Sequence, residues 1–329
     1  MGRGRILYIN IWNACNLSCC HCFNHEGKTA GTLLDKEAVI SITARARSFF
    51  GMETVQLSGG EPVQRHDFFE IADLLLEHGF RVLLQTNGIL SEGHMKKLLR
   101  YSGRNIELIV SLDGLGTHDL LRGEGNAEKV IANLEILSRY FIIRVNTMLT
   151  SKIEWAEIES VALLAQQFNL SLAFNPVCPC GRAGRNLLMP VRQYFDWMYR
   201  LETLRESGIT IRKGFDLLNN RLVETENCPV RKGAAIHIAA DGSVYPCGFL
   251  SGIVSCRTGS ADNTEFETLE NALRQLSSTK LPDFCSECGY YLNSRCHGGC
   301  PARIYALNGT WNMPDFYCLA DYEKQLKQS

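Results

Sequence analysis

Three cysteines near the start of the chain have the spacing of metal ligands. Cys15, Cys19 and Cys22 follow one another as C-x3-C-x2-C, directly after an apolar run. Three thiolates from one loop can each bind one iron of a 4Fe-4S cluster and leave the fourth iron open to a ligand that is not a protein residue. An iron with such an open position can take part in catalysis. A zinc site is the alternative, and its fourth ligand would be Cys20, His21 or His25.

Seven of the eight cysteines between residues 228 and 318, all but Cys256, form a second series. Cys285 and Cys288 form a C-x2-C pair, and Cys296 and Cys300 form a C-x3-C pair. The other three are Cys228, Cys247 and Cys318. Structural zinc sites and iron-sulfur clusters both use such spacing. The 14 cysteines in 329 residues are more than an ordinary cytosolic enzyme carries, and ligand binding would account for them.

Polar or glycine-rich segments follow three apolar runs that are predicted strands. They are residues 58–62 (Ser-Gly-Gly-Glu-Pro), 86–88 (Thr-Asn-Gly) and 111–114 (Ser-Leu-Asp-Gly). Glycine lets the backbone approach a ligand closely, and the Glu61 carboxylate can meet a cation. Each segment alone is a common turn. Their order at successive strand ends predicts one shared binding site.

The cysteine loop and these segments together resemble the radical S-adenosylmethionine (SAM) superfamily. The resemblance implies SAM contacts at His21, Gly59, Gly60, Glu61, Ser111, Arg122 and Asn146. His21 would stack near the adenine, and the Gly-Gly-Glu segment would bind the methionine ammonium group. Ser111 would contact the ribose or the carboxylate, and Arg122 the carboxylate. Asn146 either touches the ribose or is a structural residue of its strand.

The C-terminal cysteines resemble the SPASM extension of radical SAM enzymes. This resemblance implies a distal 4Fe-4S cluster on Cys285, Cys288, Cys296 and Cys318. It implies a proximal cluster on Cys228, Cys247 and Cys300. Together with the first loop, three 4Fe-4S clusters are expected, one that binds SAM and two auxiliary. The spacing departs from the family in one place, because seven residues instead of five separate the second and third distal cysteines.

Only three ligands of the proximal cluster are assured, because residues 220–227 contain no cysteine. Cys178, Cys180 or Cys256 could supply a fourth ligand, or that iron could stay open to substrate or water. Cys20 is also outside both patterns. Each of these four thiols could equally be a small buried apolar side chain.

The resemblance implies an enzyme that cleaves SAM reductively to a 5′-deoxyadenosyl radical, which abstracts a hydrogen atom from the substrate. An electron donor such as flavodoxin or ferredoxin is expected. Maturation of a ribosomally made peptide is the leading interpretation. A separate leader-peptide-binding protein would then be needed, because the first predicted strand starts near residue 5. The alternative is dehydrogenation, epimerisation or decarboxylation of a small sugar, nucleoside or cofactor precursor.

The sequence does not identify a catalytic base. In sulfatase-maturing relatives an aspartate follows the cysteine of the Gly-x4-Cys unit, whereas Gly248 follows Cys247 here, which disfavours sulfatase maturation. Asp241 is a weak candidate, because Asp-Gly is first of all a hairpin-turn signal. This turn predicts a hairpin between residues 236–238 and 244–245.

The elements that must position these residues alternate along the first half of the chain. Runs rich in Ile, Leu and Val predict buried parallel strands at 6–11, 54–57, 81–85, 106–112, 142–148 and 170–175. Helical patterns lie between them, near 35–50, 66–78, 91–101, 125–140 and 153–168. Right-handed crossovers would join the strands into an α/β fold, a partial (β/α)6 TIM-like barrel with its chemistry at the strand carboxyl ends.

The pattern changes after residue 176, where a cysteine-containing loop precedes a helical stretch near 190–206. We expect a radical SAM partial-barrel core over residues 1–180 and a helical linker over 181–227. A small cysteine-rich α+β SPASM domain would occupy residues 228–329.

Charge and hydropathy exclude several classes of protein. Lysine and arginine total 34 against 35 acidic residues, so nothing favours a nucleic-acid or membrane-surface partner. No run approaches 18 apolar residues, and no cleavage site follows the first apolar run, so we expect no membrane span, no signal peptide and a cytoplasmic location. A zinc-stabilised binding module is the remote alternative. It would need a basic, aromatic-rich face, which the balanced charge disfavours.

Overall fold

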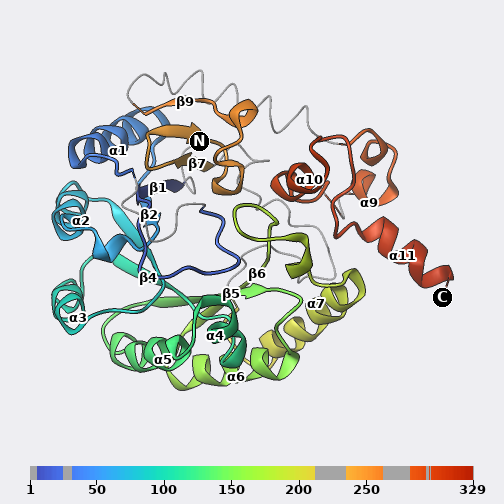
Figure 1. Ribbon diagram of the computed structural model, residues 1–329, viewed down its shortest axis with the longest axis horizontal. Helices are drawn as coiled ribbons and strands as arrows, with labels where there is room; N and C mark the ends of the chain where they lie inside the picture. Colours follow the sequence, from blue (N-terminus) through green and yellow to red (C-terminus); the bar gives the residue numbers. More distant parts are fainter. Residues whose placement is uncertain are drawn as a thin grey trace.

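The computed structural model describes residues 6–24, 32–211, 235–261, 282–293, 296 and 298–328. Within these residues nine strands form one sheet in the order β6-β5-β4-β3-β2-β1-β7-β8-β9. The first six are β1 (Ile6–Trp12), β2 (Thr54–Gly59), β3 (Arg81–Thr86), β4 (Ile106–Ser111), β5 (Ile143–Leu149) and β6 (Ser171–Pro176). All neighbours among these six are parallel, and the sheet curves into a partial barrel (Figure 1).

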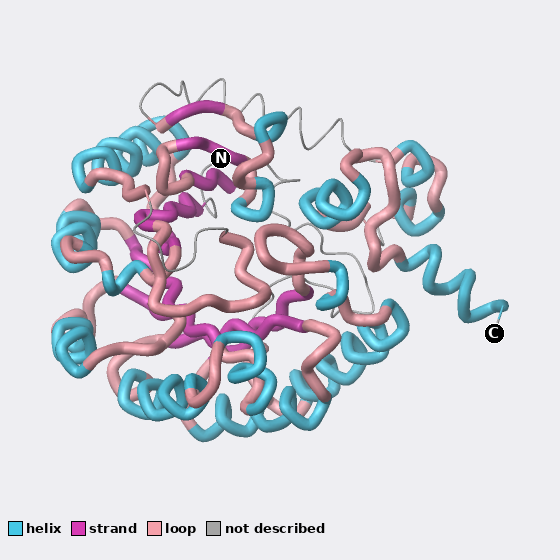
Figure 2. Tube along the Cα trace, in the orientation of Figure 1, coloured by secondary structure: helices cyan, strands magenta, loops and turns pink. Residues whose placement is uncertain are grey.

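Helices connect the parallel strands and form the outer layer of the barrel (Figures 1 and 2). They are α1 (Lys36–Phe50), α2 (Phe68–Glu77), α3 (Glu92–Leu99), α4 (Gly116–Arg122), α5 (Asn126–Leu137) and α6 (Trp155–Gln167), followed by α7 (Val191–Glu206). In α1, Val39, Ile42 and Ala46 recur at helical spacing and are buried. Gly51 ends this helix in the left-handed conformation, and its N–H donates to the carbonyl of Arg47.

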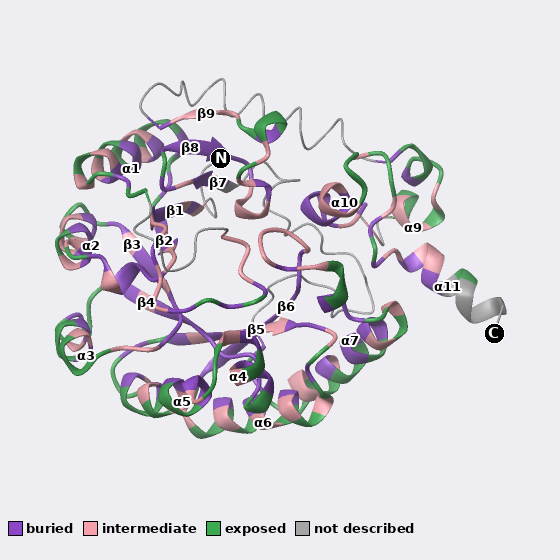
Figure 3. Ribbon diagram, in the orientation of Figure 1, coloured by how far each residue is buried: buried purple, intermediate pink, exposed green. Residues whose placement is uncertain are grey.

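The core lies between the sheet and these helices. Leu7, Ile9 and Ile11 of β1 are fully buried, and Figure 3 shows the same burial along the neighbouring strands. Strands covered in this way need apolar residues over most of their length, which is the pattern that the sequence shows. The predicted α/β partial barrel is confirmed.

All six predicted strands and all six predicted helices are present, with ends that differ by a few residues, and α4 was not predicted. This helix has only seven residues, and its stabilising contacts come from outside its own sequence. Thr117 N–H donates to Glu157 of α6 at 2.8 Å. The Asp119 carboxylate accepts from the N–H groups of Gly125 and Ala127. No local periodicity predicts such a helix, and α4 ends with Arg122, a residue of the site.

The sheet continues beyond residue 228. β7 (Ala235–Ile238) pairs in parallel with β1, and β8 (Ser243–Tyr245) pairs antiparallel with β7, before β9 (Gly259–Ser260). The predicted hairpin is confirmed, with Gly242 at φ +78° in its turn. The proposed division into 1–180, 181–227 and 228–329 remains a prediction.

The C-terminal segment packs against α7. It contains α9 (Gly289–Leu292), α10 (Pro301–Asn308) and α11 (Leu319–Gln328). Tyr317 stacks on Tyr194 of α7 with ring centroids 3.9 Å apart, and Tyr322 stacks on Phe195 at 4.4 Å. These aromatic pairs connect the cysteine-rich segment to the barrel. No helix in the described part of the chain has both the length and the apolar character needed to cross a membrane.

Candidate functional site

The first cysteine loop follows β1 directly and lies at the carboxyl end of the barrel strands. Cys19 is buried, whereas Cys15 and Cys22 are half-buried. The Leu17 N–H donates to the Cys15 sulfur at 3.3 Å. Burial raises the pKa of the Cys15 thiol to about 11, and the nearby Cys19 and Cys22 also raise it. The three sulfurs therefore share one environment.

Backbone hydrogen bonds connect this loop to three parts of the barrel. After β2, the Glu61 N–H donates to the Ala14 carbonyl at 3.0 Å. At the end of α4, the Leu121 carbonyl accepts from the Cys20 N–H at 2.9 Å. After β6, the Arg182 N–H donates to the carbonyl of Cys22 at 2.8 Å. The loop is thus positioned by chain segments far from it in sequence.

Two glycines allow the loop to approach β2. A Cβ on Gly60 would overlap the carbonyl oxygen of Ala14, and a Cβ on Gly59 would overlap that of Trp12. Gly59 also has φ +145°, which residues with a side chain rarely adopt. Both predicted SAM-contact glycines therefore lie beside the cysteine loop.

Glu61 is fully buried, and its carboxylate faces the end of β3. It accepts from the Thr86 hydroxyl at 2.8 Å, from the Asn87 N–H at 2.7 Å and from the Val63 N–H at 3.4 Å. Burial raises the pKa of Glu61 to about 7, although the hydrogen bonds from Asn87 and Thr86 oppose the rise. The carboxylate thus holds the end of β3 against the segment after β2.

The Asn87 side chain connects the end of β3 to the cysteine loop. Its side-chain nitrogen donates to the Asn16 side-chain oxygen at 2.8 Å and lies 3.8 Å from the Cys15 sulfur. The sequence identified the segment 86–88 but not this residue. The feature of the sequence that could have identified Asn87 is its position directly after a strand.

A buried ion pair borders the other side of the loop. The Arg122 Nε lies 2.6 Å from Asp113 Oδ2, and the His21 Nε2 lies 3.3 Å from the same oxygen. Burial would raise the pKa of Asp113, but Arg122 and His21 lower it below its usual value. Burial and Arg122 lower the pKa of His21 to about 4, so this imidazole is neutral near pH 7. Arg122 also places Nη1 4.0 Å from the Cys19 sulfur.

The structure brings His21 and Arg122 together, as one binding site requires, but joins them through Asp113. This residue belongs to the identified segment 111–114, although the sequence did not single it out. Its second oxygen accepts from the Met148 N–H at 2.8 Å. The carboxylate therefore connects the loop, α4 and β5.

Ser111 and Asn146 are neighbours on β4 and β5. Gln85 of β3 joins them, because its amide donates to the Ser111 hydroxyl at 3.3 Å and accepts from the Asn146 amide at 3.5 Å. On the adjoining strands the Ser58 hydroxyl donates to Asn10 at 2.6 Å. Polar side chains thus run across the strands, and Ser111 and Asn146 among them remain predicted SAM contacts.

The two positions considered for a base lie in different surroundings. Asp241 is exposed, and its carboxylate accepts from the Ser243 N–H at 2.9 Å, which is the contact of a turn residue. Gly248 begins a 3-10 turn (Gly248–Leu250) and faces His237, because a Cβ there would lie 3.1 Å from the imidazole ring. The buried His237 therefore fills the space that a side chain at position 248 would need.

The C-terminal cysteines form two groups in the described residues. Cys296 has Cys288 as an electrostatic neighbour, and Cys318 has Cys296. Cys247 and Cys300 instead belong to a packed group after β8. Cys285 is buried at the end of a 3-10 turn over Asp283–Cys285. The last predicted ligand, Cys228, lies outside the described residues.

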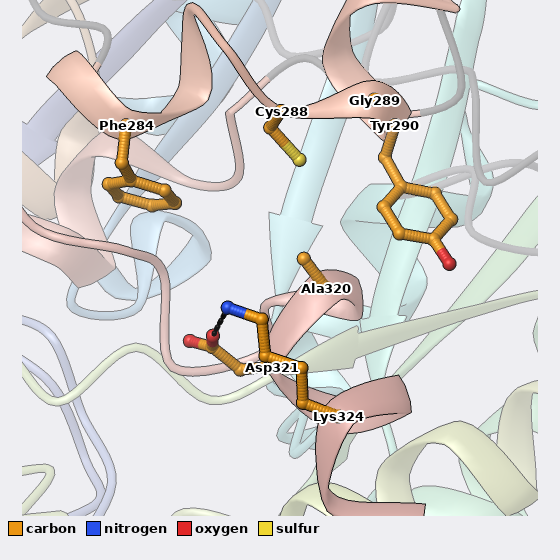
Figure 4. Close-up of a pocket in the computed structure, with 7 residues that line it drawn as sticks. All are labelled: Phe284, Cys288, Gly289, Tyr290, Ala320, Asp321 and Lys324. Atoms are coloured by element: carbon orange, nitrogen blue, oxygen red, sulfur yellow. Dashed lines mark ion pairs between the residues drawn. The ribbon is translucent and has the colours of Figure 1, made fainter. Parts of the chain in front are cut away.

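Cys288 borders a pocket of about 420 Å³ between α9 and α11. Figure 4 shows its sulfur directed toward the space above Ala320, with an ion pair between Lys324 and Asp321 at the far side. The lining residues are Phe284, Cys288, Gly289, Tyr290, Ala320, Asp321 and Lys324. A thiol from the predicted distal set therefore faces open space.

The donor set fits iron-sulfur chemistry better than it fits a single ion. Among the described residues, no three Cys, His, Asp or Glu side chains converge closely enough to hold one metal ion. A 4Fe-4S cluster does not require such convergence, because each thiolate binds a different iron. Three thiols of one loop, with Asn87 and Arg122 nitrogens beside two of the sulfurs, satisfy that chemistry.

Comparisons with known proteins cover almost the whole chain. Residues 9–165 match the sequence profile of the Radical SAM superfamily. The AdoMet-dependent heme synthase of Methanosarcina barkeri is 28% identical over 96% of this chain and 96% of that protein. The mycofactocin maturase MftC of Mycobacterium tuberculosis is 26% identical over 94% of this chain and 82% of that protein.

Solved structures share the fold. SuiB of Streptococcus suis bound to S-adenosylmethionine has a TM-score of 0.76 at 17% identity, covering 95% of this chain and 77% of that one. The anSMEcpe structure with bound AdoMet has a TM-score of 0.75 at 23% identity, covering 98% and 96%. The match to the Radical SAM superfamily implies a 4Fe-4S cluster and SAM. The profile match, the cysteine loop and the partial barrel agree, and residues 9–165 of the chain match the radical SAM superfamily.

Proposed function

We propose that this chain matures a ribosomally made peptide by hydrogen-atom abstraction. The observation that carries the chemistry is the three-cysteine loop, held at the carboxyl end of the barrel beside Arg122 and Asn87. Two structures that share the fold support a peptide substrate. SuiB bound to its precursor peptide SuiA has a TM-score of 0.78, and anSMEcpe with bound AdoMet and the Cp18Cys peptide has 0.76.

Cys15, Cys19 and Cys22 would hold the first cluster. When bound and reduced, this cluster supplies the electron that cleaves SAM to methionine and a 5′-deoxyadenosyl radical. Arg122 and Asn87 would offset the negative charge of the thiolates through the nitrogens that lie near their sulfurs.

The proposed SAM contacts surround this loop. Arg122 can pair with Asp113 and still offer further N–H groups to the SAM carboxylate, since a guanidinium has five donors. Glu61 would act by holding Asn87 and the glycine segment in place, and His21 would border the adenine. Ser111 and Asn146 would face the ribose. The barrel would exclude water and orient the substrate C–H bond.

The C-terminal region would hold two auxiliary clusters of the SPASM type. Cys285, Cys288, Cys296 and Cys318 would bind the distal cluster, and Cys228, Cys247 and Cys300 the proximal one. With the first loop, the reconstituted chain should contain about twelve irons. Iron and sulfide analysis after anaerobic reconstitution measures this number. Saturation at about four irons, with zinc in the remaining sites, would contradict the SPASM assignment.

Replacing Cys15, Cys19 and Cys22 together by alanine tests the first cluster. The triple variant should form no 5′-deoxyadenosine from SAM and dithionite, while the C-terminal iron stays. Cys20→Ala is the matched control, because Cys20 is in the same loop but outside the motif, and it should retain cleavage. Formation of 5′-deoxyadenosine by the triple variant would contradict the proposal.

The match to the heme synthase favours a second candidate, oxidation or decarboxylation of a small cofactor precursor. The two candidates can be separated by mass spectrometry. The enzyme is incubated with SAM and either a peptide encoded beside its gene or a porphyrin precursor of heme. We expect a mass change in the peptide only. A mass change in the porphyrin alone would assign the second function.

We further propose that the enzyme works in the cytoplasm with flavodoxin or ferredoxin as its electron donor. A separate leader-peptide-binding protein would present the peptide. Reduction of the first cluster by purified flavodoxin, followed by electron paramagnetic resonance, tests the donor.

A further inference from the structure

Cys300 lies at the start of α10 among other thiols. The cysteines in or against its packed group near α10 come from the loop after β6, the turns after β8 and the start of α10, and they are Cys178, Cys180, Cys247, Cys256 and Cys300. The buried Asp315 accepts from the Cys300 N–H at 2.8 Å, so a carboxylate lies directly beside this group. The electrostatic surroundings of Cys300 therefore depend on the residues around Asp315.

Arg303 balances the charge of this carboxylate. Its Nε and Nη2 donate to the two Asp315 oxygens, Nε at 2.6 Å. Its guanidinium carbon also lies 4.7 Å from the centre of the Tyr317 ring. Tyr317 in turn stacks on Tyr194 of α7. The buried ion pair therefore lies between the backbone of Cys300 and two stacked tyrosines.

The hydroxyl groups of these two tyrosines differ. The Tyr317 hydroxyl donates to the Met189 carbonyl at 3.1 Å. The Tyr194 side chain is fully buried, and its hydroxyl has no hydrogen-bond partner within the described part of the chain. Such a donor costs stability, because it has lost its hydrogen bonds to water. Phenylalanine would keep the stacked ring without this cost, so the hydroxyl requires a separate explanation.

The ionisable groups that act on the Tyr194 hydroxyl are Arg303, Asp315, Tyr317 and Cys300. Arginine only donates hydrogen bonds, and Asp315 already accepts the three hydrogen bonds described above. The Tyr317 hydroxyl has its own acceptor. Cys300 is the remaining group, and a thiolate that ligates iron can accept hydrogen bonds. Burial raises the pKa of the Tyr194 hydroxyl, so it keeps its proton and can donate.

We propose that the Tyr194 hydroxyl donates a hydrogen bond to the Cys300 sulfur when the proximal cluster is bound. This inference rests on the proposed function, which makes Cys300 a ligand of that cluster. Hydrogen bonds to the sulfurs help to set the potential of an iron-sulfur cluster. They raise it, because they stabilise the reduced cluster, which is the more negative state. Tyr194 is thus a positioning residue that acts through Cys300 and raises the reduction potential of the proximal cluster.

The test uses the full-length chain with Cys15, Cys19 and Cys22 replaced by alanine, so that all remaining iron is auxiliary. Adding Tyr194→Phe keeps the stacked ring, so the variant should bind as much iron as this parent. A redox titration followed by electron paramagnetic resonance should then show one auxiliary signal with a lower midpoint potential than in the parent. Tyr317→Phe is the matched control, because it removes the hydroxyl of the stacked partner, whose acceptor is a backbone carbonyl. It should leave that signal unchanged.

A second readout detects the hydrogen bond itself. After reconstitution in D₂O, electron-nuclear double resonance on the same signal should show a coupling to an exchangeable deuteron in the parent. This coupling should be missing in Tyr194→Phe and present in Tyr317→Phe.

Two outcomes would overturn the inference. One is a midpoint potential and a deuteron coupling in Tyr194→Phe that equal those of the parent. The other is an equal shift in Tyr317→Phe, which would make the aromatic stack responsible and not the hydroxyl of Tyr194. A parent without auxiliary iron would contradict the SPASM clusters as well, whereas a parent with both clusters and an unshifted variant would contradict this inference alone.

Discussion

The two cysteine regions of this chain are built in different ways. The first loop carries the three thiols of its motif within eight residues, and backbone hydrogen bonds to α4 and to the segments after β2 and β6 hold it at the barrel. The packed group near α10 collects its thiols from positions 178 to 300. A local set of ligands is preorganised by one loop, whereas a dispersed set depends on every segment that contributes to it.

Each region nevertheless contains one buried arginine-aspartate pair that touches a cysteine. Arg122 pairs with Asp113 and reaches the Cys19 sulfur. Arg303 pairs with Asp315, which binds the backbone of Cys300. The two pairs are equivalent in type, so substituting them compares the two regions directly.

The largest effects are expected from Arg122→Met and Arg303→Met. Each leaves a buried carboxylate without its partner, and each should lower the unfolding free energy by about 3–5 kcal/mol. Arg122→Met should lose SAM cleavage and keep the auxiliary iron, and Arg303→Met should lose proximal iron and keep the first cluster. Denaturant titration and iron analysis measure both effects.

Arg139→Met is the control for this comparison, because Arg139 pairs with Glu135 on the surface and is 65% exposed. It should change stability by less than about 1 kcal/mol. If Arg122→Met and Arg303→Met lose the same clusters, the two regions are not independent and the comparison fails.

A smaller effect is expected from Gly60→Ala, because its Cβ would overlap the Ala14 carbonyl and push the first loop from β2. The cost should be about 1–3 kcal/mol, with less iron in the first cluster and unchanged auxiliary iron. Gly79→Ala is the matched control, since Gly79 has φ +75° but open space around its Cβ. It should be strained by about 1–2 kcal/mol and keep full iron. Equal iron loss in both variants would show that backbone strain, not the contact with the loop, is responsible.

The smallest effect is expected from Asn87→Ala, which removes the amide beside Asn16 and the Cys15 sulfur. It should cost about 1 kcal/mol and slow 5′-deoxyadenosine formation without abolishing it. Asn87→Asp should slow the reaction further, because a carboxylate repels the thiolates. The rate of 5′-deoxyadenosine formation tests this order, and a faster aspartate variant would exclude an electrostatic role for Asn87.

The sequence by itself determined the barrel, the first cysteine loop and the segments at the strand ends. These features are local, because the Ile, Leu and Val runs specify buried strands and three cysteines within eight residues specify one loop. The hairpin at Asp241-Gly242 was predictable for the same reason, since two residues define its turn.

Only the tertiary structure decided what these local features contact. In the sequence, Asp113 is one residue of the segment 111–114 and has no evident partner. In the structure α4, whose sequence has no periodic pattern, places Arg122 beside it. Cys178 and Cys180 had no partner in sequence, and folding placed them beside residues more than a hundred positions away. Spacing encodes contacts within a loop or a turn, but contacts between distant segments depend on how the strands and helices pack, and a single sequence does not display that packing.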